Sequence, residues 1–143
     1  AGEMSGHFFL NDRWPGFDDS IYNACRLLEI VGRDSSSSRG GLKFSERFHQ
    51  LPNYPSTDEA KIPLPGDRDD VMSRIIDSFS DMRYSEVDGI RVRYEDGWYL
   101  CRPSNTEPIL VMRAEGRTGD ALEKILRDVD SRIGSMLDLT NLL

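Results

Sequence analysis

The chain has 143 residues, of which 38% are hydrophobic and 30% charged, and its net charge is −7. This composition is typical of a globular domain and disfavours a nucleic-acid partner, because binding to a phosphate backbone requires a basic face. No apolar run approaches membrane-spanning length and no signal peptide is visible, so we expect no membrane partner. Cys25 and Cys101 have apolar neighbours and no metal-ligand spacing, which predicts two buried free thiols in a reducing compartment.

The chain opens with Gly2-Glu3-Met4-Ser5-Gly6-His7, and the apolar Phe8-Phe9-Leu10 that follows predicts a strand. In an extended backbone, Glu3, Ser5 and His7 project on the same side. A carboxylate, a hydroxyl and an imidazole together suit the recognition of sugar hydroxyls, and His7 could also move a proton near neutral pH. The alternative is a Gly-rich turn with one hydrogen-bonded histidine, and these residues taken alone favour that alternative.

A helix is predicted next, capped by Asp18 or Asp19 and ending near Gly32. Its apolar face consists of Ile21, Cys25, Leu28 and Val31. One strand and one helix cannot close a core, so this part of the chain is expected to need a sheet that it lacks. Together with a first residue that is not Met, this suggests a piece of a longer protein.

A domain boundary is predicted near residue 50. Residues 33–41 are rich in Ser and Gly and contain no apolar residue, which is typical of a linker or surface loop. A short helix is expected around residues 42–50, and Pro52 and Pro55 follow it. We therefore divide the chain into residues 1–50, a strand-helix remnant of an α/β domain, and residues 51–143, a compact α+β domain.

The second domain is predicted to be a small antiparallel sheet with two helices covering one face. Strands are expected at 60–64, 90–94, 98–101 and 109–114, with Pro63 favouring a sheet edge for the first of them. Asp67 should cap one helix and Thr118 the other. The apolar faces of these helices are Val71, Met72, Ile75, Ile76 and Phe79, and Leu122, Ile125, Leu126, Val129, Ile133 and Leu137.

The loop Arg102-Pro103-Ser104-Asn105-Thr106-Glu107-Pro108 connects two of these strands and is a candidate anion site. Successive amides of residues 104–106 could converge on one point, and the Arg102 guanidinium suits two phosphate oxygens. An ordinary hairpin turn is an equally good description on chemistry alone. Arg91 and Arg93 are expected to form the solvated face of the sheet, or else to draw an anion towards the loop.

The opening stretch and this loop together resemble the α-D-phosphohexomutases, specifically the phosphomannomutase/phosphoglucomutase branch. Gly2-Glu3-Met4-Ser5-Gly6-His7 resembles the sugar-binding loop of that family, and residues 102–108 resemble the phosphate-binding loop of its fourth domain. Two further stretches are similar to the same branch: Gly16-Phe17-Asp18-Asp19 before the first helix, and Asp88-Gly89-Ile90-Arg91-Val92 before Gly97-Trp98.

The resemblance implies a cytoplasmic enzyme of four domains, the fourth similar in fold to the TATA-box-binding protein. It implies a phosphoserine that exchanges its phosphoryl group with a hexose phosphate, a Mg²⁺ ion, and glucose or mannose 1,6-bisphosphate as activator and intermediate. The implied sugar-binding residues are Glu3, Met4, Ser5, Gly6 and His7, with His7 a candidate for proton handling. The implied phosphate-binding residues are Arg102, Pro103, Ser104, Asn105 and Thr106.

The chain lacks the serine motif and the aspartate metal loop of the family, and we interpret Asp67, Asp69 and Asp70 as helix caps. No catalytic or metal-binding residue is therefore expected here, and the chain alone should not turn over substrate. Its expected partners are a hexose phosphate and the N-terminal domains of the same enzyme. A phosphoglucosamine mutase is the alternative within the family, although Met4 and Asn105 favour the glucose/mannose branch. A non-catalytic phosphosugar-binding module is the alternative outside it. A nucleic-acid-binding domain is disfavoured by the charge and by the lack of exposed aromatic platforms.

Overall fold

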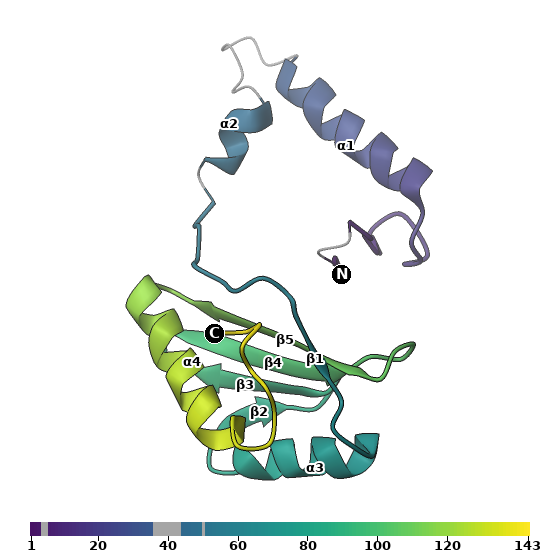
Figure 1. The fold of residues 1–143 in the computed structure, drawn as a ribbon. Helices are drawn as coiled ribbons and strands as arrows, with labels where there is room; N and C mark the ends of the chain where they lie inside the picture. Colours follow the sequence, from purple (N-terminus) through teal and green to yellow (C-terminus); the bar gives the residue numbers. More distant parts are fainter. Residues whose placement is uncertain (4–5, 36–43, 50) are drawn as a thin grey trace. The chain divides into compact units, whose positions relative to one another are not determined.

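A computed structural model describes residues 1–3, 6–35, 44–49 and 51–143 (Figure 1). The chain forms two compact units, Ala1–Pro52 and Asn53–Leu143, which divide two residues after the boundary expected from the sequence. Across the described ranges, we find no helix that is both long enough and apolar enough to cross a membrane.

The first unit contains α1 (Ser20–Ser35) and α2 (Phe44–Phe48). Asp19 caps α1 as predicted, because its carboxylate accepts hydrogen bonds from the amides of Ile21 and Tyr22. The predicted helix end at Gly32 is wrong: α1 continues to Ser35, since a single glycine costs a helix only about 1 kcal/mol. The predicted linker therefore begins later than residue 33, and residues 36–43 lie outside the described part.

Two further expectations for this unit are corrected. Phe8-Phe9-Leu10 is not a full strand: Phe8 bridges Gly2 and Phe9 exchanges hydrogen bonds with Ala1, so the pairing is limited to the few residues at the start of the chain. Cys25 is exposed and not buried. The same apolar face of α1 is open, with Ile21 77% and Leu28 68% exposed, so this unit alone does not cover that face.

The second unit is a five-stranded antiparallel sheet with the strand order β1-β5-β4-β3-β2. Its elements are β1 (Ala60–Pro63), α3 (Arg68–Ser78), β2 (Arg83–Ser85), β3 (Ile90–Tyr94), β4 (Gly97–Pro103), β5 (Ile109–Gly116) and α4 (Gly119–Ile133). β1 lies at an edge, as Pro63 predicted. β2 was missed, because Arg-Tyr-Ser is too short to show alternation and becomes a strand only by pairing with β3.

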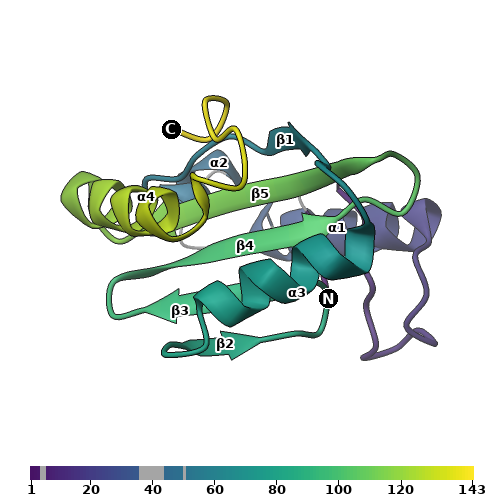
Figure 2. The same cartoon turned by 60° about the horizontal axis from the view of Figure 1, so that its bottom comes forward.

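Helices α3 and α4 pack on one face of this sheet, which confirms the predicted α+β architecture (Figure 2). Asp67 and Thr118 cap them through side-chain oxygens, as expected. The core contains both predicted apolar stripes and the inward side chains of β3, β4 and β5, including Tyr99 and Cys101. Leu139 and Leu142, which follow the last helix, complete the core. Neither helix of the second unit packs on the opposite face of the sheet, which we call the helix-free face (Figure 1).

Candidate functional site

The 102–108 loop joins β4 to β5 at one end of the sheet. Arg102 is the penultimate residue of β4 and pairs with Val111 across the ladder. Because the neighbouring Cys101 side chain is fully buried in the core, Arg102 projects from the helix-free face. Its Nη1 lies 3.7 Å from Asp88 Oδ2, and the two side chains are 37% and 68% exposed. This contact is long and solvated, so the guanidinium is available to a ligand.

The turn before β3 holds Asp88 against this arginine. Gly89 has φ +68°, and a Cβ on it would lie 2.3 Å from the Cys101 carbonyl oxygen and 2.6 Å from Arg102 Cα. Only glycine can adopt this conformation with the strand so close. The Asp-Gly pair therefore fixes a carboxylate beside the candidate anion site.

The backbone of the loop does not form the predicted anion nest. The Ser104 amide donates to the Ile109 carbonyl at 2.9 Å, and the amides of Thr106 and Glu107 donate to Ser104 Oγ at 3.3 and 3.2 Å. The expectation that three amides converge on a ligand is therefore wrong, because the Ser104 hydroxyl closes a local turn and uses two of the loop amides.

The donors that the loop presents are side chains. Asn105 and Thr106 are exposed, and the Thr106 hydroxyl lies 3.4 Å from Ser104 Oγ. A hydroxyl, a carboxamide and the Arg102 guanidinium are thus grouped at the end of β4. Such groups can bind the oxygens of a phosphate, with the guanidinium making the strongest contact.

A second guanidinium reaches the loop from α3. Arg68 Nη2 donates to Asn105 Oδ1 at 3.3 Å, across 37 residues of sequence. Sequence reasoning missed Arg68, because nothing local distinguishes it from other exposed charges at a helix start. Asp67 accepts the amides of Asp69 and Asp70, as the capping interpretation predicted. Among the side chains that the structure describes, no group of three or more His, Cys, Asp or Glu is placed to hold a metal ion.

Residues 1–3 and 7–9 of the opening stretch pair with each other as a short antiparallel hairpin. The Glu3 amide donates to the His7 carbonyl at 2.9 Å, and the Gly6 amide donates back to the Glu3 carbonyl at 3.1 Å. Gly6 has φ +88°. The stretch is therefore not one continuous extended segment, but the bridge between Gly2 and Phe8 places Glu3 opposite His7, where their side chains project to the same side as predicted. Met4 and Ser5 lie outside the described residues.

His7 is oriented by a carboxylate. Its Nδ1 lies 2.5 Å from Asp18 Oδ2, and Asn23 Nδ2 donates to Asp18 Oδ1 at 3.3 Å. The hydrogen bond to Asp18 raises the pKa of His7 above its ordinary value. The ring is 56% exposed and borders a hollow of about 740 Å³ within the first unit. An oriented, accessible imidazole of this kind can hold or move a proton at a ligand.

Comparison with known proteins assigns the chain to a class and then to a family. Residues 57–132 match the model of the phosphoglucomutase/phosphomannomutase C-terminal domain. The chain is 41% identical over 131 residues to a phosphomannomutase/phosphoglucomutase of Pseudomonas syringae pv. tomato, a match that covers 87% of the chain and 26% of the relative. It is likewise 41% identical over 132 residues to a phosphoglucomutase of Neisseria meningitidis serogroup A, covering 87% and 27%.

A solved structure shows the same relationship. A phosphoglucomutase/phosphomannomutase family protein from Burkholderia thailandensis superposes with a TM-score of 0.74 and 36% identity, covering 94% of this chain and 27% of that one. The chain therefore belongs to the phosphoglucomutase/phosphomannomutase family and contains its C-terminal domain. It spans roughly a quarter of the length of these relatives.

Proposed function

We propose that the chain is the C-terminal part of a phosphohexomutase that interconverts hexose 1-phosphates and hexose 6-phosphates of glucose, mannose or both. The observation that carries this proposal is the grouping of Arg102, Asn105 and Thr106 at the end of β4, with Arg68 hydrogen-bonded to Asn105. Family membership supports the reaction class.

In this proposal the loop binds the phosphate that is not reacting. Arg102 makes the charge-assisted contacts, and Asn105 and Thr106 donate hydrogen bonds to the remaining oxygens. Ser104 closes the turn through its hydroxyl and presents Thr106 beside it. Because the loop binds a phosphate and does not read the sugar, the same contacts serve the 1-phosphate and the 6-phosphate.

The opening turn binds the sugar in this proposal. The carboxylate of Glu3 and the hydroxyl of Ser5 bind ring hydroxyls, and Met4 and Gly6 belong to the same sugar-binding stretch. His7, oriented by Asp18, holds or accepts a proton near the reacting oxygen. Other domains of the same enzyme would supply the phosphoserine and Mg²⁺, and glucose or mannose 1,6-bisphosphate would be the intermediate.

The complete enzyme tests this proposal directly. A coupled assay that compares glucose, mannose and glucosamine 1-phosphates should show turnover of the first two, whereas preference for glucosamine phosphate would assign it to the phosphoglucosamine mutases. The isolated chain should bind hexose phosphate without converting it. A complete protein that binds hexose phosphate and turns over none of the three would be a non-catalytic phosphosugar-binding protein.

A further inference from the structure

The helix-free face of the sheet is strongly basic although the chain is acidic overall, with a net charge of −7. Residues directly opposite each other on antiparallel strands project to the same side. The ladder therefore places the following side chains on this face: Arg83, Arg91, Arg93, Trp98, Leu100, Arg102, Arg113 and Glu115. Such segregation of cations in an acidic chain indicates a site for an anion.

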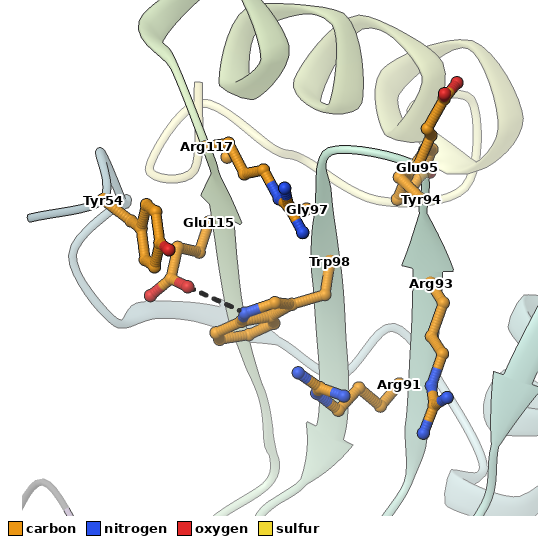
Figure 3. Close-up of a pocket in the computed structure, with 10 residues that line it drawn as sticks. Tyr54, Arg91, Arg93, Tyr94, Glu95, Gly97, Trp98, Glu115 and Arg117 are labelled. Atoms are coloured by element: carbon orange, nitrogen blue, oxygen red, sulfur yellow. Dashed lines mark hydrogen bonds between the residues drawn. The ribbon is translucent and has the colours of Figure 1, made fainter. Parts of the chain in front are cut away.

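The far end of this face, away from the Arg102 loop, forms a hollow of about 280 Å³ (Figure 3). The Trp98 indole forms its centre: Trp98 Nε1 donates to Glu115 Oε1 at 3.1 Å, and the Arg91 guanidinium carbon lies 4.9 Å from the ring centroid. Tyr54 borders the same hollow. The indole is thus fixed at its polar edge and flanked by a cation.

Three arginines line this hollow, namely Arg91, Arg93 and Arg117, and Arg117 Nε lies 3.9 Å from Asp96 Oδ1. Arg83 and Arg93 are directly opposite each other on β2 and β3, a like-charge pair that destabilises a sheet. Neither makes an ion pair or hydrogen bond within the described part of the chain. A bound anion beside Arg93 would relieve this repulsion.

The carboxylate of Glu115 indicates what else the ligand carries. It lies at the indole beside Arg91 and Arg93, whereas the Glu95 carboxylate points away from the indole (Figure 3). A simple anion would therefore meet repulsion as well as attraction. Carboxylates accept hydrogen bonds from hydroxyl groups, guanidinium groups bind phosphate, and an indole face packs against the C–H face of a sugar ring. The combination fits a ligand that has both a phosphate and neighbouring hydroxyls.

We infer that this hollow is a second binding site for a phosphorylated sugar, separate from the Arg102 loop. Trp98 and Arg102 are four residues apart on β4, which is ~13 Å at the rise of an extended strand. One chain would thus bind two phosphorylated sugars, or hold a released one near the loop. Because the two sites use different residues, failure of this inference would leave the loop proposal standing.

Trp98 provides a local fluorescence signal for the test. The chain has two tryptophans, and a Trp14→Phe background leaves Trp98 as the sole indole. An Arg102→Ala substitution in that background disables the loop. Titration with glucose 6-phosphate should still give a saturable change in Trp98 fluorescence. Inorganic phosphate should bind at least fivefold more weakly, and glucose should give no saturable change.

Matched arginine variants locate the binding. Arg93→Ala should weaken the glucose 6-phosphate signal at least fivefold, whereas Arg127→Ala, on α4 in a pair with Glu123, should leave it unchanged. Circular dichroism and urea midpoints confirm that each variant is folded. The inference is overturned if no saturable change occurs, if phosphate binds as tightly as the sugar phosphate, or if Arg93→Ala has no effect. Displacement of glucose 6-phosphate by lower concentrations of a hexaglutamate peptide would also overturn it, in favour of an acidic protein partner.

Discussion

Removal of the Arg102 guanidinium should separate its binding role from any structural role. Its only ion pair within the described part of the chain is the 3.7 Å contact with exposed Asp88, and such surface pairs contribute about 0–1 kcal/mol. Arg102→Ala should therefore lower the free energy of unfolding by less than about 1 kcal/mol. If the guanidinium makes a charge-assisted contact with phosphate, its removal should instead weaken phosphate binding by about 2–3 kcal/mol. That corresponds to a dissociation constant raised by ~30- to 150-fold.

The assay is calorimetric titration of the chain with glucose 1-phosphate and glucose 6-phosphate, together with KM measurements on the complete enzyme. The fluorescence titration described above reports the Trp98 hollow separately, so a residual weak signal there does not obscure the result. Arg127→Ala serves as the control, because it removes the same charge from an exposed ion pair on α4. It should change neither affinity by more than about twofold, or ~0.4 kcal/mol.

The affinities for both sugar phosphates should weaken together, since in the proposed function the loop contacts the phosphate and not the sugar. If only one regioisomer loses affinity, the idea of a shared phosphate site is wrong. If Arg102→Ala lowers the urea midpoint markedly while affinity persists, Arg102 is a structural residue. Asp88→Asn gives the opposite test: removal of a carboxylate 3.7 Å from Nη1 should tighten phosphate binding severalfold.

Three other predictions concern the elements that support the two candidate sites. Gly89→Ala should destabilise the second unit by about 2–5 kcal/mol in urea denaturation, because the backbone there is left-handed and the new Cβ would overpack against β4. Gly119→Ala is the control and should be nearly neutral, since a Cβ at that position meets nothing within 4 Å. Equal effects of the two substitutions would refute the close approach of Gly89 to β4. The pKa of His7 is raised in the folded chain, so its pairing with Asp18 stabilises the first unit fully below pH 6.5, and this stabilisation is lost as the pH rises through the folded-state pKa. In NMR titrations, Asp18→Asn should lower the pKa of His7. An unchanged pKa would show that Asp18 is not the cause of the shift. Burial raises the pKa of the Cys101 thiol to about 12, so of the two thiols it alone should resist Ellman's reagent until the chain unfolds, and rapid reaction of both in the folded chain would contradict this.

Much of the second unit follows from local sequence. Alternating Ile90-Arg91-Val92-Arg93 predicted a strand with one buried and one solvated face, and both faces are as expected. Asp67 and Thr118 predicted the starts of their helices, because a short polar side chain accepts hydrogen bonds from amides that a helix start leaves unpaired. The short strand β2 was not predicted, since three residues are too few to show the alternation of a strand and become one only by pairing with β3.

The sequence by itself located two candidate motifs, residues 102–108 after β4 and the Gly-rich stretch at the start, because each is a contiguous run. It could not determine how their atoms are used. Only the tertiary structure shows that the Ser104 hydroxyl takes the loop amides, that Arg68 reaches Asn105 from another element, and that Arg83, Arg93 and Trp98 share one face. Hydrogen-bond partners and cross-strand neighbours depend on distances between residues far apart in the chain, and local patterns carry no information on those distances.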